Sequence, residues 1–274
     1  MKNCLVIGSG RSGTSMVAGT LAGAGYFMGK NVRRKGDGSN PKGYFESYEL
    51  GKVNEEIVYP MMWIGRKRRL LRWGLTRLRL KEPLRYPLFN EQLRKWTRWL
   101  AMVPVDAEPK VTPEITETIQ DFVSQEPYCY KSPLFCYTLP AWRPYLRNTV
   151  YLCVFREPQR TAASIVKEVQ VKSYLEGITI TFEEALETWT LLYRHILEKH
   201  RFMGDWLFIH YNQVLTPEGL DRLEALIEAP VDRSFPEARL SRSRSDEPIP
   251  AHTAAVYRQL CELAGYDDDG QTSQ

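Results

Sequence analysis

The fold class is decided by one stretch near the start of the chain, Cys4-Leu5-Val6-Ile7-Gly8-Ser9-Gly10-Arg11-Ser12-Gly13-Thr14-Ser15. A short apolar run ends in a turn rich in glycine and serine, and a helical pattern begins directly after it. Glycines let consecutive backbone N–H groups point at one anion, and the helix adds its unpaired N–H groups and the positive end of its dipole. The stretch therefore predicts a strand, a phosphate-binding loop and a helix.

Further along the chain, three more short apolar runs alternate with helical patterns. We expect these runs to form strands over residues 127–131, 149–155 and 206–210. Proline at first helical positions and a capping-box pattern support helices, which we expect over residues 13–24, 47–58, 113–125, 158–172, 182–199, 217–227 and 251–264. This alternation is typical of an α/β protein in three layers, with a central, mostly parallel sheet between helices.

Residues 61–102 have a different composition from the rest. Between Arg66 and Trp99, lysine and arginine far outnumber the acidic residues, and tryptophans are interleaved with them. Such a segment fits a basic cap over an anionic ligand, a membrane-surface helix or a nucleic-acid face. It also fits two amphipathic helices with solvated cationic faces, which we favour for most of these charges. We predict one domain over residues 1–266 with a helical cap insertion at 61–102, which we keep as a source of substrate selectivity, and a disordered tail over 267–274.

Composition narrows the function class further. The chain has 274 residues with 37 lysines and arginines against 33 aspartates and glutamates, a net charge of +4 that is too small to indicate nucleic-acid binding. The five cysteines have no metal-type spacing, and we expect them to be reduced. No apolar run is long enough to span a bilayer and no signal peptide precedes the first strand, so we expect a cytoplasmic protein. Peripheral membrane contact and the oligomeric state stay open.

The loop differs from the nucleotide-binding pattern G-x-x-x-x-G-K-[ST] at one position. Gly8, Gly13 and Ser15 fit it, but Thr14 stands where the lysine that reaches the β- and γ-phosphates belongs. The loop's cation is Arg11 instead. This disfavours an ATPase or GTPase, although a P-loop kinase or NTPase and a non-catalytic nucleotide-binding protein remain alternatives.

Several motifs together resemble the sulfotransferase family, which uses 3′-phosphoadenosine 5′-phosphosulfate (PAPS). Arg11-Ser12-Gly13-Thr14-Ser15 is similar to the family's 5′-phosphosulfate loop, and Arg156-Glu157-Pro158 with Ser164 resembles its 3′-phosphate motif. Residues 40–46, 131–133 and 209–213 also resemble family segments. The resemblance follows the family order over residues 3–227, and it is closest to bacterial members.

The resemblance implies a role for each matching residue. Arg156 and Ser164 would bind the 3′-phosphate, and Arg11 and Lys131 would neutralise the leaving oxygen without a metal. Glu46 would act as the general base, whereas its local sequence alone favours a carboxylate at a helix start. The 5′-phosphosulfate would lie on Gly10, Arg11, Ser12, Gly13, Thr14 and Ser15. The acceptor would be a hydroxyl or amine of a carbohydrate or small metabolite.

Overall fold

Four parallel strands form the centre of the molecule. The computed structural model of the chain describes residues 1–62, 101–172, 175–238 and 245–267. The strands pair in the order β2-β1-β3-β4, with bounds β1 (Asn3–Ile7), β2 (Cys129–Lys131), β3 (Thr149–Phe155) and β4 (Asp205–His210). In the register, Cys4 of β1 lies between Cys129 and Val150, and Val150 in turn pairs with Asp205. The sheet confirms the predicted α/β class.

The strands read as continuous apolar runs because helices cover both faces of the sheet. Leu5 and Ile7 of β1 belong to the core on one face, while Cys4 and Val6 belong to the core on the other, and all four are fully buried. This alternation follows from the two-residue period of a strand.

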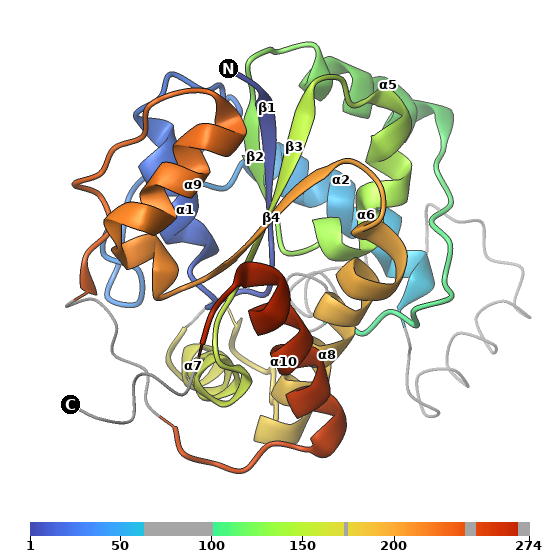
Figure 1. Cartoon of the computed structure of the whole chain (residues 1–274). Helices are drawn as coiled ribbons and strands as arrows, with labels where there is room; N and C mark the ends of the chain where they lie inside the picture. The colour runs from blue at the N-terminus through green and yellow to red at the C-terminus, as the bar shows by residue number, and fades with distance from the viewer. Residues whose placement is uncertain (63–100, 173–174, 239–244, 268–274) are drawn as a thin grey trace, which may run out of the picture.

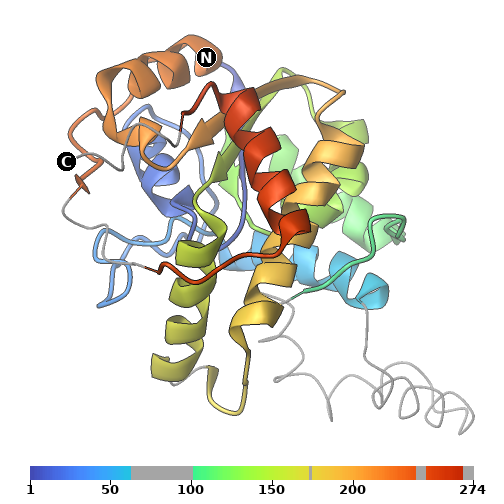
Figure 2. The same cartoon turned by 60° about the horizontal axis from the view of Figure 1, so that its bottom comes forward.

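The helices sort into layers around this sheet (Figure 1). One face carries α1 (Thr14–Ala22) and α9 (Pro217–Ile227). The other carries α2 (Tyr48–Val58), α5 (Pro113–Val123), α6 (Phe135–Trp142), α8 (Phe182–His195) and α10 (Ala251–Ala264). The remaining helix, α7 (Pro158–Val171), runs beside α8 at one end of the sheet (Figure 2).

Side-chain caps explain where several helices begin. Thr112, Thr181 and Thr216 each accept a hydrogen bond from the backbone N–H three residues later. The capping box between Thr181 and Glu184 is present as predicted. The predicted helix over 182–199 is confirmed as α8, but its last turn widens to a π-helix over Ile196–His200.

One helix, α6, was not predicted from the sequence. Every residue of it except Pro140 is buried, so no polar face produces a helical period in the sequence. Pro140 also reads as a helix breaker, although it lies in the last turn. Most of the predicted cap insertion (63–100) and of the predicted tail (268–274) lies outside the described residues.

The sequence also predicts reduced cysteines and no membrane-spanning segment. All five cysteines are buried and free of disulfides. Within the ranges that the structure describes, no helix is long and apolar enough to cross a membrane.

Candidate active site

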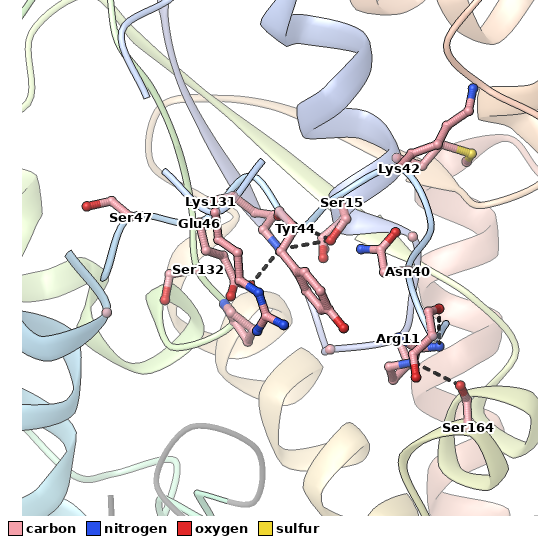
Figure 3. A pocket seen from close by; sticks show the side chains of 18 of the residues that line it. Arg11, Ser15, Asn40, Lys42, Tyr44, Glu46, Ser47, Lys131, Ser132 and Ser164 are labelled. Carbon is pink, nitrogen blue, oxygen red and sulfur yellow. Dashed lines mark hydrogen bonds and ion pairs between the residues drawn. The ribbon is translucent and has the colours of Figure 1, made fainter. Parts of the chain in front are cut away.

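A cavity of about 540 Å³ lies at the carboxyl edge of the sheet. Arg11 follows β1, Lys131 is the last residue of β2, and Arg156 follows β3; all three line the cavity. The loop between α1 and α2 contributes Glu46. Carboxyl ends of parallel strands share one edge, which is why residues so distant in the sequence meet here. Three cations from different strand ends thus line one cavity, and Figure 3 shows two of them, Arg11 and Lys131.

The loop after β1 is fixed to the sheet by a buried tyrosine. The Tyr193 hydroxyl donates to the Val154 carbonyl (2.7 Å) and accepts from the Ser9 N–H (3.1 Å). Gly8 has a φ of 150°, and a Cβ at this position would lie 2.1 Å from the Val154 carbonyl oxygen. Glycine is therefore required where the loop leaves the strand.

Arg11 joins the two predicted phosphate motifs directly. Its Nε donates to the Ser164 hydroxyl on α7 (3.0 Å), and its Nη2 donates to the Ser39 carbonyl (3.1 Å). Its Nη1 lies 3.8 Å from the carboxylate of Glu168, which is also on α7. The guanidinium is thus held between α7 and the loop before α2, with part of it lining the cavity (Figure 3).

Lys131 and Glu46 form an ion pair in the middle of the cavity. The Lys131 Nζ lies 2.5 Å from Glu46 Oε1 and 3.0 Å from the Ser15 hydroxyl. The side chain of Lys131 is 3% exposed and that of Glu46 is 40% exposed. Burial lowers the pKa of the Lys131 amine, and the Glu46 carboxylate opposes that shift. The helix start itself is capped by Ser47, so Glu46 is available to the cavity.

Arg156 presents a buried, oriented guanidinium to the cavity. The residue is 5% exposed, its Nε lies 3.4 Å from the Glu157 carboxylate, and its Cζ lies 4.6 Å from the centre of the Tyr211 ring. Burial lowers its pKa and Glu157 opposes the shift. Such a planar, fixed fork suits a phosphate group.

The other loop residues predicted to bind the cofactor divide into two groups. Gly10, Gly13, Thr14 and Ser15 line the cavity. Ser12 does not: it is fully buried, and its hydroxyl lies 3.5 Å from that of Thr161 on α7. The Ser12 side chain therefore packs the loop onto α7, and its role in binding stays a prediction.

Asp37, which the sequence did not single out, organises the loop that carries Glu46. Its carboxylate accepts hydrogen bonds from the Tyr44 hydroxyl (2.8 Å) and the Ser39 N–H (2.9 Å), and it pairs with Lys172 (2.8 Å). Burial alone would raise the pKa of Asp37, but Lys172 and these hydrogen bonds hold it well below its usual range. In the sequence, Asp37 between two glycines indicates only a turn.

The first turns of α2 supply further lining residues that the sequence did not reveal. Tyr48, Gly51 and Glu55 line the cavity together with Ser47. Their spacing of about four residues places them on one face of the helix. This spacing is the one feature of the sequence that could have indicated a shared helix face. It does not identify a cavity wall, because the same spacing is equally common on helix faces that point into solvent.

The predicted segment 209–213 supports the C-terminal helix instead of pointing mainly into the cavity. The Asn212 side chain donates to the Tyr266 hydroxyl (2.9 Å), and the Gln213 side chain donates to the Ala264 carbonyl (3.0 Å). His210 stacks on the Tyr266 ring at 3.8 Å between centroids. Tyr211 alone of these four lines the cavity.

Comparisons with known proteins add little to this geometry. No protein-family model matches the chain, and no curated protein matches it. Among solved structures, the sulfotransferase domain from the olefin synthase of Synechococcus PCC 7002 is similar, with 17% identity, 97% of each chain covered and a TM-score of 0.48. The function is therefore inferred from the residues that line the cavity and not from this similarity.

Proposed function

We propose that the protein is a PAPS-dependent sulfotransferase. The observation that carries this proposal is that Arg11, Lys131 and Arg156, from three strand ends, line one cavity together with Glu46. Three cations suit a donor that carries a phosphosulfate and a second phosphate. A carboxylate beside them suits an acceptor that must lose a proton.

Two sets of cavity residues would hold the two anionic groups of the donor. The N–H groups of the loop and the start of α1 would hold the 5′-phosphosulfate, with the Lys131 amine reaching it from β2. Arg156 and Ser164 would hold the 3′-phosphate. A donor phosphate near Ser164 would also contact Arg11, since those two side chains touch. The Thr14 side chain leaves the Walker lysine position without a cation, which disfavours a nucleoside triphosphate.

The reaction would be an in-line displacement at sulfur. The acceptor oxygen or nitrogen forms a bond to sulfur while the bond from sulfur to the bridging phosphate oxygen breaks, and that oxygen keeps the electron pair. Lys131 and Arg11 neutralise the charge that develops on it. The acceptor proton passes to the Glu46 carboxylate. The products are a sulfated hydroxyl or amine of a carbohydrate or small metabolite, and adenosine 3′,5′-bisphosphate.

Calorimetric titration of the full chain with adenosine 3′,5′-bisphosphate and with ADP tests this function. The two ligands differ in where the second phosphate sits, so a sulfotransferase binds the 3′,5′-bisphosphate more tightly. Equal affinity for both ligands, or binding of neither, overturns the proposal. Magnesium-dependent ATP hydrolysis by the same preparation would instead support a P-loop kinase or NTPase.

A further inference from the structure

The cavity extends well beyond the groups assigned to the donor. Figure 3 shows Ser47, at the start of α2, on the opposite side of the Lys131–Glu46 pair from Arg11 and Ser164. The wall on the Ser47 side is one face of α2, formed by Tyr48, Gly51 and Glu55. We refer to these three residues as the α2 wall. The ion pair therefore divides the cavity into a donor end and an end lined by the α2 wall.

Gly51 is unusual because nothing in the backbone requires glycine there. It lies inside α2, and a Cβ added to it would meet no atom within 4 Å among the described residues. Gly8, by contrast, has a carbonyl oxygen 2.1 Å from such a Cβ. A glycine in a helix interior destabilises the helix by about 1 kcal/mol relative to alanine. Among the described residues, Gly51 therefore leaves open space in the wall of the cavity.

The groups around this space are acidic and aromatic. Glu55 is 3% exposed and lines the cavity on one side of Gly51, while Tyr48, which is 57% exposed, lines it on the other. Glu46 lies just before the same helix. Glu46 is paired with Lys131 and Glu55 also has an interaction partner, so the wall is distinguished by its shape and not by a free negative charge.

We propose that the α2 wall is the acceptor subsite and that Gly51 sets the size of acceptor that fits it. This inference rests on the proposed function, because it takes the Arg11 end of the cavity for the donor. An acceptor on the α2 wall has its nucleophilic atom beside Glu46. Glu46 then lies between the acceptor proton that is removed and the donor, which lies on the far side of Lys131.

Replacement of Gly51 by cysteine allows the space to be filled after folding. All five native cysteines are buried, so Gly51→Cys introduces a thiol that benzyl methanethiosulfonate can reach from the cavity. Lys52→Cys is the matched control, because Lys52 is the next residue of the same helix and is exposed. We expect the benzyl adduct at position 51 to lower sulfuryl transfer by about tenfold or more and to leave the Kd for adenosine 3′,5′-bisphosphate unchanged. The adduct at position 52 should change neither.

Either of two results overturns the assignment of Gly51. Unchanged transfer by the adduct at position 51 places the acceptor elsewhere, and loss of bisphosphate binding places Gly51 at the donor end. If Gly51→Cys does not fold, Gly51→Ala gives the same test, with a raised Tm, an unchanged bisphosphate Kd and an increased KM for acceptors. Failure of the unmodified protein to prefer the bisphosphate over ADP is a separate readout, which rejects the proposed function itself.

The acceptor used with these variants is chosen from a panel of two scaffolds, a sugar and a phenol. The unmodified protein is incubated with labelled PAPS and with methyl glucoside, glucosamine, glucuronate, 4-ethylphenol, tyramine or 4-hydroxyphenylacetate, and the compound that is labelled fastest is taken.

Discussion

The Lys131 Nζ lies 2.5 Å from Glu46 Oε1, and this contact joins the end of β2 to the loop that precedes α2. Lys131 is buried and Glu46 is partly exposed, so the cation lies at the base of the cavity and the carboxylate lies nearer its opening. A donor phosphosulfate near Ser15 would compete with Glu46 for the Lys131 amine, since Ser15 already lies 3.0 Å from it. Donor binding would thereby release Glu46 to act as a base.

Glu46→Gln tests that role. The amide keeps the size of the side chain and can still accept a hydrogen bond from Lys131, but it cannot take up a proton. We expect turnover to fall by roughly 10²- to 10⁴-fold, the usual contribution of a general base. The Kd for adenosine 3′,5′-bisphosphate should stay within a factor of a few, because Glu46 does not bind the nucleotide. Unchanged turnover in a steady-state transfer assay would move the base to another residue.

Arg156→Lys tests the recognition of the 3′-phosphate. Lysine keeps the charge but loses the planar fork that Tyr211 and Glu157 orient. A hydrogen bond to a charged group is worth about 1.5–3 kcal/mol, so the Kd for adenosine 3′,5′-bisphosphate should rise about 10- to 150-fold. Affinity for ADP, measured by the same calorimetry, should change much less. An equal loss for both ligands would place Arg156 away from the 3′-phosphate.

Arg156→Ala is a weaker test of 3′-phosphate recognition than Arg156→Lys. Arg156 is buried against the carboxylate of Glu157. After the substitution that carboxylate would keep Arg160 at 3.0 Å and the neutral His210 ring at 3.8 Å. We therefore expect Arg156→Ala to lower Tm as well, because a buried carboxylate loses a compensating cation.

The sequence predicted the parts of the site that depend on the sheet. Arg11, Lys131 and Arg156 each follow a short apolar strand, and parallel strands bring their carboxyl ends to one edge whatever lies between them. The contact of Arg11 with Ser164 could not be predicted, because it depends on how α7 packs against the loop. Neither the helix propensity of the residues nor the spacing of apolar residues in the sequence predicts how the helix packs on the loop.

Two other features were hidden for different reasons. The helix α6 is buried on nearly all sides and so lacks the polar face that reveals a helix in a sequence. Asp37 lies in a loop, where the sequence has no regular hydrophobic pattern. Only the structure shows that its carboxylate contacts both Tyr44 and Lys172. The alternation of strands and helices in the sequence therefore predicts which residues lie at the strand ends. It does not predict the side-chain contacts that the loop and the helices make in the site.

Asp37→Asn tests whether that carboxylate holds the loop that carries Glu46. An amide cannot accept all the hydrogen bonds and the Lys172 ion pair that the carboxylate takes, so we expect a loss of about 1–3 kcal/mol in the free energy of unfolding. Backbone N–H groups within the loop should also exchange faster. Among them, the Arg33 N–H donates to the Glu46 carbonyl, and the Tyr44 and Phe45 N–H groups donate to the Arg33 carbonyl.

The matched control for Asp37 is Asn31→Ala in the same loop. Asn31 makes an exposed side-chain hydrogen bond to Glu49. We expect this variant to leave the exchange of the Tyr44 and Phe45 amides unchanged in deuterium-exchange mass spectrometry. Equal acceleration in both variants would show that the loop has no single anchor at Asp37.

Three buried histidines, His195, His200 and His210, make the stability of the fold sensitive to mild acid, because burial lowers the pKa of each. The shift is largest for His200 and His210. His200 is 2% exposed, its Nε2 lies 3.1 Å from the Cys136 carbonyl, and burial lowers its pKa to about 4. His210 is fully buried, and burial followed by repulsion from Arg156 lowers its pKa to about 3. The carbonyl of Cys136 can only accept, so the neutral His200 ring carries its proton on Nε2.

The sign of the pH dependence follows from these directions. In the unfolded chain a histidine takes up a proton at about pH 6.5, whereas in the fold these two rings stay neutral until far lower pH. The unfolded state thus binds more protons below pH 6.5, and the free energy of unfolding falls as the pH decreases. Between pH 7 and pH 5 each ring should remove about 2 kcal/mol, while most carboxylates stay ionised in both states.

Urea unfolding at pH 7 and pH 5 measures this effect, with variants that separate the two rings from the rest of the chain. His200→Asn keeps a polar side chain that can donate to the Cys136 carbonyl but does not titrate, so the difference between the two pH values should shrink by about 2 kcal/mol. His252→Asn is the matched control, because the His252 side chain is 60% exposed and should leave the difference as in the unmodified protein. An unmodified protein that is equally stable at both pH values would show that the buried rings accept protons as readily in the fold as in the unfolded chain.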